Sequence, residues 1–395
     1  MTNSKRVLAA TLVAALGLAA CGGDDDDDAV TTDPAGTEAA STEPAGTEPA
    51  GTEPAGTEPA GTEPAGEPVD GSDVTVGLTF DLLGRGDQSF NDSAAAGADR
   101  LIEEFGVTVN ELTPTDASAR GTDLQLQAEN ADIVIGVGFS FANDAKSIAV
   151  ENPDVAFAII DDSMLNDTFD GPAAENAAGL VFSEEQGSYL VGVAAALKST
   201  TGKIGFIGGV SGIGLIEKFE AGYIAGARSI NPDIEVVSQY LSEFPDFAGF
   251  EDPASANDIA TSMYGEGADI IYAAAGLSGS GMFAAAKAVS DETGTKVWGI
   301  GVDSDQYLTV DPEVQEFVLT SMIKRVDVAV YEVVKSFIEG TFSAGEVRYD
   351  LSVDGVGYST SGGFIDDIVE QLEEAKAAII DGSIVVPTDP AEARG

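Results

Sequence analysis

The sequence contains no histidine and a single cysteine, Cys21. The missing histidine excludes Ser-His-Asp and Cys-His catalysis and removes the commonest zinc ligand. One cysteine cannot form a disulfide framework or a thiolate metal site within the chain. We therefore expect no cofactor and no metal. The classes that remain are ligand-binding proteins and enzymes that work without His or Cys.

Basic residues are also scarce. Only 18 of the 395 residues are Lys or Arg, against 68 Asp and Glu, and the formal net charge is −50. Such a field repels a phosphate backbone, so the composition excludes nucleic acid as a partner. Hydrophobic residues make up 44% of the chain, which is enough for a sizeable core, and the length fits two to three domains.

The first residues have the layout of a signal peptide. Lys5 and Arg6 precede an apolar run from Val7 to Ala20, which is too short to span a bilayer comfortably. The residues Leu18-Ala19-Ala20-Cys21 resemble the bacterial lipobox, in which the signal is cut before a cysteine that is then acylated. We expect residues 1–20 to be removed, Cys21 to be the lipidation site, and the lipid to hold the protein on the extracytoplasmic face of the cell membrane.

Residues 21–72 have the composition of a spacer. They include a run of five aspartates from Asp24 to Asp28 and five copies of Thr-Glu-Pro-Ala-Gly from Thr42 to Gly66. Between Cys21 and Val69 the only large apolar residue is Val30. Such a segment cannot bury enough surface to offset its ordering entropy. We therefore expect a disordered acidic tether.

From residue 73 onward, short β-branched runs alternate with stretches of helical period. The predicted strands are 74–80, 107–112, 133–137, 155–160, 179–182, 204–207, 234–240, 269–273 and 297–302, and the predicted helices include 91–105, 184–198, 215–229, 252–264 and 281–290. This alternation predicts an α/β fold with parallel sheets flanked by helices. So many strands exceed one doubly wound lobe of usual size, so we expect two similar lobes with a cleft between them.

Carboxylates, glycines and aromatic residues follow several predicted strands. In parallel sheets ligands lie beyond the carboxyl ends of the strands, so these residues are candidates for one site. Carboxylates accept hydrogen bonds from hydroxyl groups and aromatic faces stack on flat rings, which together match an uncharged polyol carrying a flat ring. Each Asp taken alone also fits a helix N-cap, and Phe90 also fits a core position. The predicted ligand-binding residues are Asp81, Phe90, Asn91, Phe139, Asp161, Asp162, Phe250, Tyr272, Gly276, Asp303 and Lys324.

Several of these segments, taken in order, resemble the basic membrane protein family of ABC-transporter solute-binding lipoproteins. The resemblance rests on Ser89-Phe90-Asn91, on the Gly-x-Gly-Phe turn at 136–139, on the block 185–223, on Gly299–Asp303 and on 319–327. It covers residues 73 to about 387. It implies a two-lobed periplasmic binding protein fold of type I with three interlobe crossovers. It also implies a purine nucleoside as the ligand and the permease of an ABC importer as the partner.

The resemblance also implies roles for the candidate residues. Phe90 would stack on the base, with Asp81 and Asn91 bonded to its edge. Asp161 or Asp162, together with Asp303, would hold the ribose hydroxyls beside Lys324. The second aromatic would come from the other lobe, with Tyr272 as first choice and Phe250 as second. We expect a monomer, with lobe 1 at residues 73–182 plus 322–350 and lobe 2 at 183–321 plus 351–387.

Two other functions fit parts of the sequence. The glycines of 208–214 resemble the nucleotide loop of short-chain dehydrogenases, and Tyr331 and Lys335 match their Tyr-x-x-x-Lys with Ser321 upstream. Against this, about 130 residues of α/β pattern precede the loop, Tyr331 fits a core position on a helix, and an exported protein has no NAD supply. The other alternative is the ligand-binding component of a signalling receptor system, which the sequence does not separate from transport.

Overall fold

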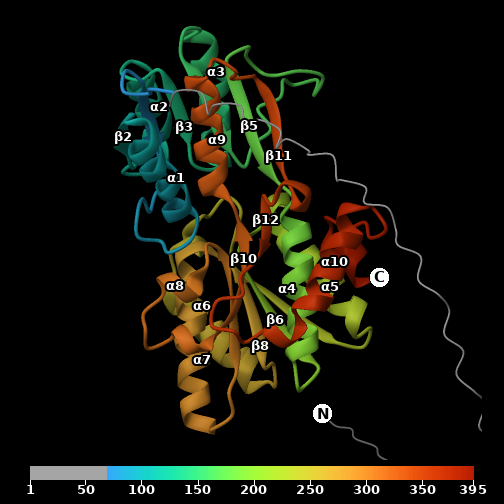
Figure 1. Cartoon of the computed structure of the whole chain (residues 1–395). Helices are drawn as coiled ribbons and strands as arrows, with labels where there is room; N and C mark the ends of the chain where they lie inside the picture. Colours follow the sequence, from blue (N-terminus) through green and yellow to red (C-terminus); the bar gives the residue numbers. More distant parts are fainter. Residues whose placement is uncertain (1–68) are drawn as a thin grey trace, which may run out of the picture. The chain divides into compact units, whose positions relative to one another are not determined.

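The computed structural model describes residues 69–395. Figure 1 shows two sheets with their helices, the first in the upper half of the view and the second in the lower half. The predicted signal peptide, Cys21 and the repeats of the spacer lie outside the described residues. No helix between residues 69 and 395 combines the length and hydrophobicity needed to cross a membrane.

The first sheet has the strand order β11-β5-β4-β3-β1-β2, and all its strands are parallel. Its strands are β1 (Thr75–Thr79), β2 (Thr108–Leu112), β3 (Ile133–Gly136), β4 (Ala156–Ile160), β5 (Ala177–Phe182) and β11 (Gly345–Tyr349). The helices packed with it are α1 (Phe90–Phe105), α2 (Arg120–Ala128), α3 (Ala142–Glu151) and α9 (Val326–Ile338). Every residue of β3 and β4 is buried, as expected for parallel strands covered by helices on both faces.

The second sheet repeats this plan with the order β12-β10-β9-β8-β6-β7, in which only β12 is antiparallel to its neighbour. Its strands are β6 (Lys203–Ser211), β7 (Glu235–Glu243), β8 (Ile270–Ala274), β9 (Trp298–Asp303), β10 (Val318–Lys324) and β12 (Val356–Tyr358). The helices packed with it are α4 (Glu184–Lys198), α5 (Gly214–Ile230), α6 (Pro253–Gly265), α7 (Gly279–Thr293), α8 (Gln306–Thr309), α10 (Val369–Ile380) and α11 (Pro390–Arg394).

The chain passes between the two sheets three times. It crosses after β5, again between β10 and α9, and last between β11 and β12. The predicted α/β fold of two parallel-dominated sheets with three crossovers is therefore confirmed. All nine predicted strands are present, and β10, β11 and β12 were not predicted as strands.

The ends of the predicted lobes differ slightly from the sheet boundaries. β10 stays in the second sheet through Lys324, three residues beyond the predicted boundary at position 321. At the start, the buried Gly71 donates its N–H to Phe105 O at 3.0 Å, although residues 69–72 were assigned to the spacer. At the end, Arg394 of α11 pairs with Glu220 of α5 at 2.6 Å. The folded part therefore extends beyond residues 73–387 at both ends.

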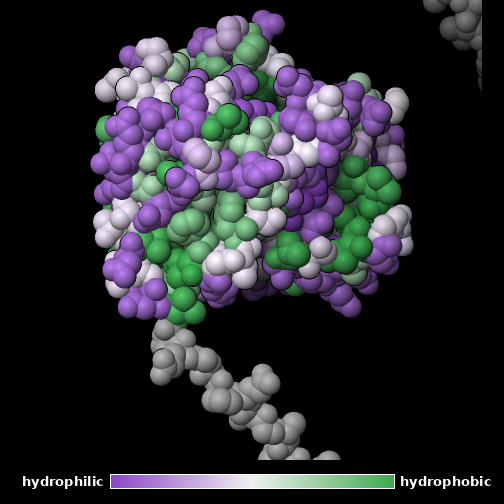
Figure 2. Space-filling model, turned by 90° about the horizontal axis from the view of Figure 1, so that it is seen from above, coloured by the Kyte–Doolittle hydropathy of each residue, from purple (hydrophilic) through white to green (hydrophobic). Residues whose placement is uncertain are grey.

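The surface matches the acidic composition. Figure 2 shows a face of the molecule covered mostly by hydrophilic residues, with smaller hydrophobic areas between them. After residue 73 the chain holds 53 acidic and 16 basic residues, so this surface carries a strong negative charge. Such a charge keeps a protein soluble and disfavours anionic ligands near it.

Candidate ligand-binding site

A cleft opens where the carboxyl ends of β1, β3 and β4 face those of β8 and β9. Both sheets contribute residues to its lining, and the empty space between them is about 800 Å³, part of it open to solvent. The lining includes nine of the predicted residues, namely Asp81, Phe90, Asn91, Phe139, Asp161, Phe250, Gly276, Asp303 and Lys324.

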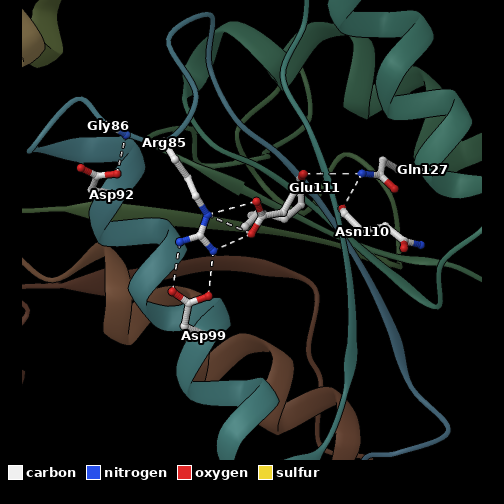
Figure 3. A network of polar contacts seen from close by, with 8 residues as sticks. Arg85, Gly86, Asp92, Asp99, Asn110, Glu111 and Gln127 are labelled. Atoms are coloured by element: carbon white, nitrogen blue, oxygen red, sulfur yellow. Dashed lines mark hydrogen bonds and ion pairs between the residues drawn. The ribbon is translucent and has the colours of Figure 1, made fainter.

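The loop before α1 supplies one wall of the cleft, and a network of polar contacts holds this loop in place. Figure 3 shows the guanidinium of Arg85 between Asp99 of α1 and Glu111 of β2. The N–H of Gly86 donates to Asp92 Oδ1 at 2.7 Å (Figure 3). The loop between β1 and α1 therefore makes polar contacts with both α1 and β2. These contacts hold the loop in place at the cleft.

Two buried polar residues, Asp87 and Asn91, bond mainly within this loop and the start of α1. Asp87 accepts hydrogen bonds from the backbone N–H groups of Ser89, Asn91 and Asp92 at 2.8–3.0 Å, so its carboxylate caps the start of α1. Burial raises the pKa of Asp87, while these backbone donors lower it. Asn91 accepts from Asp81 N at 3.1 Å and donates to Asp87 at 3.0 Å. Asn91 lines the cleft, and both ends of its amide already have a partner within the loop.

The next wall is made by two acids that end equivalent strands. Asp161 follows β4 and Asp303 ends β9, and both have left-handed backbones with φ of 69° and 63°. Asp tolerates this conformation better than most residues, and positive φ outside glycine often marks functional sites. The two sheets therefore present matching carboxylates to the same cleft.

Lys324, the last residue of β10, is the cation between these acids. Its Nζ lies 2.6 Å from Asp161 Oδ1 and 3.5 Å from Glu184 Oε1. Burial lowers the pKa of Lys324, but the carboxylates of Asp161, Glu184 and Asp303 together raise it more, so the ammonium stays charged. Nζ also lies 5.0 Å from the ring centroid of Phe90, which places the charged cluster beside the predicted stacking face.

Asp161 and Asp303 hold their protons more tightly than ordinary aspartates. Burial raises the pKa of Asp161 to about 6, although Lys324 opposes the shift. Burial likewise raises the pKa of Asp303, which accepts a hydrogen bond from Ser89 Oγ at 2.6 Å. Since Ser89 belongs to the first sheet's loop and Asp303 to the second sheet, this bond also joins the two walls.

The raised pKa of Asp161 gives a prediction for stability. Between pH 4 and pH 6 the folded protein binds this proton more tightly than the unfolded chain, so the free energy of unfolding should fall as pH rises through that window. Urea unfolding of the wild type and of Asp161→Asn, measured from pH 4 to pH 7, checks this. The free energy of unfolding of the wild type minus that of Asp161→Asn should decrease as pH rises. A constant difference would contradict the prediction.

The structure corrects the expectation for the second aromatic residue of the site. Tyr272, the first choice for the second aromatic, is fully buried, packs against Phe206 and Tyr223, and does not line the cleft. Phe250, the second choice, does line it. A methyl group at Gly209 of β6 would lie 2.3 Å from the Phe250 ring, so only glycine leaves room for this ring against the sheet.

Asp162 also lies away from the cleft. Its Oδ1 accepts a hydrogen bond from Met164 N at 2.7 Å and lies 3.5 Å from the ammonium of Lys146. Of the two adjacent acids that were left open as ribose ligands, only Asp161 lines the cleft.

Sequence reasoning missed several residues of the lining. Leu215, Ile216 and Phe219 come from the start of α5, and Phe247 and Glu251 from the irregular segment before α6. The ring of Phe247 lies 6.1 Å from that of Phe139 on the opposite wall, so this aromatic pair bridges the cleft. Arg120, the first residue of α2, also lines it and lies 2.7 Å from Asp81.

A signal in the sequence could have indicated Arg120. A positive charge at the first residue of a helix opposes the helix dipole, which favours acids there. A residue that breaks a local rule often has a functional reason. The segment before α2 also follows the carboxyl end of β2, where ligand-binding residues are expected.

The structure separates the residues of the dehydrogenase interpretation. Gly208 and Gly209 lie within β6, where they make room for Tyr240 and Phe250. Tyr331 is buried on α9 against Phe105 of α1, whereas Ser321 is buried in the second sheet. Across residues 69–395 no group of three or more acidic side chains is arranged to hold a metal.

Comparison with known proteins adds independent information. A family model described as ABC transporter substrate-binding protein PnrA-like matches residues 74–390. A Lactococcus lactis protein named ABC transporter nucleoside-binding protein BmpA is 34% identical, over 80% of this chain and 90% of its own length. The CD4+ T-cell-stimulating antigen of Listeria monocytogenes is 36% identical, over 80% of this chain and 89% of its own.

A solved structure agrees with these matches. The crystal structure of an ABC transporter solute-binding protein from Aeropyrum pernix superposes with a TM-score of 0.69 at 29% identity. The match covers 81% of this chain and 95% of that one. The fold of the solved structure therefore agrees with the family that the sequence matches.

Proposed function

Because this chain belongs to the Bmp family of PnrA-like ABC transporter substrate-binding proteins, we propose that it binds a purine nucleoside in the cleft and delivers it to the permease of an importer. The family expected from the sequence is confirmed. The family consists of substrate-binding proteins and not of enzymes, so the dehydrogenase interpretation is wrong.

One observation carries the nucleoside proposal. One cleft is lined by aromatic rings from both lobes, Phe90 and Phe250, and by a cluster of Asp161, Asp303 and Lys324. Aromatic faces suit a flat base, and carboxylates beside an ammonium suit the hydroxyls of a ribose. The relative from Lactococcus lactis is named as nucleoside-binding, which supports the same ligand class.

The proposal is tested by titration calorimetry on the chain after removal of copurified ligand. The ligands are adenosine, guanosine, inosine, ribose, a free purine and a nucleoside monophosphate. We expect the nucleosides to bind more tightly than ribose or the free purine, because only they reach both ends of the cleft. The monophosphate should bind weakly, since its charge would face Asp81, Asp161 and Asp303. Failure of every nucleoside to bind, or strong binding of ribose alone, would overturn the nucleoside proposal.

The transport role needs the protein on the outer face of the cell membrane. We propose that it is held there by a lipid on Cys21, with residues 22–68 as the tether to the folded part. Cys21 and the tether lie outside the described residues, and the support for the anchor is the lipobox-like sequence at 18–21.

Replacing Cys21 by serine should release the protein from the membrane fraction of cells without changing its affinity for nucleoside. The acyl chain requires the thiol, whereas no residue before Val69 belongs to the described cleft. Fractionation and calorimetry on the wild type and the variant measure both effects. Unchanged membrane association of Cys21→Ser would rule out the lipid anchor.

We propose that the protein acts as a monomer. Residues 69–395 supply both walls of the cleft, so a second copy is not required to complete it. We assign one lobe to each sheet. The chain then passes from the second lobe back to the first after Lys324.

A further inference from the structure

Arg120 is the second cation of the cleft and pairs with Asp81, whereas Lys324 pairs with Asp161. Among the described residues that line the cleft, Arg120 and Lys324 are the only basic ones. Arg120 is only 5% exposed, and its guanidinium also lies 5.8 Å from the ring centroid of Phe141. A buried arginine in a cavity that already holds five acids calls for a physical explanation.

The hydrogen bonds of Arg120 leave most of its donors unused. A guanidinium has five N–H donors and no acceptor. Nη2 donates to Asp81 Oδ1 at 2.7 Å, and that oxygen also accepts from Leu82 N at 2.9 Å. The buried Nε of Arg120 has no hydrogen-bond partner among residues 69–395. Nε is closed off from solvent, whereas Nη1 makes no hydrogen bond among these residues and is not one of the buried unpaired atoms, so the edge that carries Nη1 is the one open to an acceptor supplied from outside the chain.

The position of Phe90 relates this edge to a bound base. A methyl group at Gly138 would lie 3.5 Å from Asp81 Oδ2 and 3.6 Å from Cε1 of Phe90, so the free carboxylate oxygen and the ring edge are neighbours. Lys324 Nζ lies 5.0 Å from the centroid of the same ring. A nucleoside stacked on Phe90 with its ribose at Lys324 therefore directs an edge of its base toward Asp81 and Arg120.

We propose that Arg120 makes the cleft selective for 6-oxopurine nucleosides, such as inosine and guanosine, over adenosine. This inference rests on the proposed nucleoside function. A 6-oxopurine presents the acceptors O6 and N7 side by side, the pattern that an arginine recognises with two hydrogen bonds. Its N1–H can then donate to Asp81 Oδ2. Adenosine presents an amino group in place of O6, so two donors would face each other and the donors of Arg120 that Asp81 does not accept would stay unpaired.

The first test needs no variant. Calorimetry on the full chain compares inosine, guanosine, adenosine and purine riboside, which has no substituent at position 6. We expect inosine and guanosine to bind about tenfold or more tightly than adenosine, with purine riboside also weaker than inosine. Equal affinity for inosine and adenosine would overturn the inference and leave the nucleoside function intact. Absence of binding by all four would overturn the function and the inference together.

The second test uses Arg120→Gln, because an amide can pair with adenine and cannot replace the guanidinium at O6 and N7. The variant should lose most of its affinity for inosine while keeping that for adenosine, so the ratio of the two affinities should fall by about tenfold. Arg120→Lys, which keeps the charge but not the paired donors, should lower the ratio less. The matched control is Arg100→Gln on the exposed face of α1, which should leave the ratio unchanged.

A ratio of affinities separates recognition from general damage. A purely structural role for the Arg120–Asp81 pair would weaken inosine and adenosine by the same factor and leave the ratio at its wild-type value, and this result would also overturn the inference. If Arg120→Gln fails to fold, the comparison of ligands on the wild type and on Arg120→Lys still decides the question.

Discussion

Replacing Lys324 by methionine is expected to lower the free energy of unfolding at pH 7 by about 3–5 kcal/mol, because the change leaves a buried ion cluster without its cation. Lys324 is only 2% exposed, and its Nζ lies 2.6 Å from Asp161 and 3.5 Å from Glu184. Methionine fills a similar volume, so the loss comes from the unpaired carboxylates and not from a cavity.

Urea unfolding measures the change, with the midpoint and the m-value fitted together. The control is Lys287→Met, which removes an exposed lysine paired with Asp291 on α7 and should change the free energy of unfolding by less than about 1 kcal/mol. The loss in Lys324→Met should shrink as pH falls from 7 to 5, because protonation then removes the unpaired buried charge. A loss below about 1 kcal/mol at pH 7 would contradict the description of this cluster as an ion pair in a dry site.

Phe250→Ala is expected to weaken nucleoside binding by about fivefold to a hundredfold, because base–aromatic stacking is worth roughly 1–3 kcal/mol. Phe90→Ala on the opposite wall should have an effect of the same size. Both rings line the cleft and are only partly buried, so the loss of affinity should exceed the loss of stability. Calorimetry with one nucleoside, together with urea unfolding of each variant, measures both quantities.

Tyr272→Phe is the matched control for this experiment. It removes only the hydroxyl, which lies 3.3 Å from Ser188 Oγ inside the core of the second lobe. Nucleoside affinity should therefore stay at its wild-type value, with at most a small change in stability. Weakened binding in Tyr272→Phe with unchanged binding in Phe250→Ala would show that the second stacking residue has been placed wrongly.

The repeating strand–helix pattern determined the fold without help from the structure. The apolar runs at 133–137 and 155–160 and the helical period at 184–198 predicted elements that the structure contains almost residue for residue. These segments are long, periodic and buried, so local preference and tertiary packing favour the same conformation. The three missed strands lack that agreement, since β10 carries Thr320 and Ser321, β11 is largely exposed and β12 is three residues long.

The strand-end rule also determined part of the site from the sequence alone. Asp81, Asp161 and Asp303 were placed at one cleft because parallel strands bring their carboxyl ends to the same edge of a sheet. The rule specifies the end of a strand but not the direction of each side chain. Asp161 therefore lines the cleft, whereas the adjacent Asp162 accepts a hydrogen bond from Met164 N and does not line it.

Only the tertiary structure decided between Tyr272 and Phe250. Both faces of a parallel strand are buried, so the sequence of β8 does not tell which face the Tyr272 side chain occupies. Phe250 lies in an irregular segment without periodicity, and its ring is positioned by contact with Gly209, about 40 residues earlier in the chain. Arg120 is a similar case, because its pairing with Asp81 joins α2 to the end of β1. The sequence determined which elements form and where their ends meet, whereas contacts between distant segments decided which side chains enter the cleft.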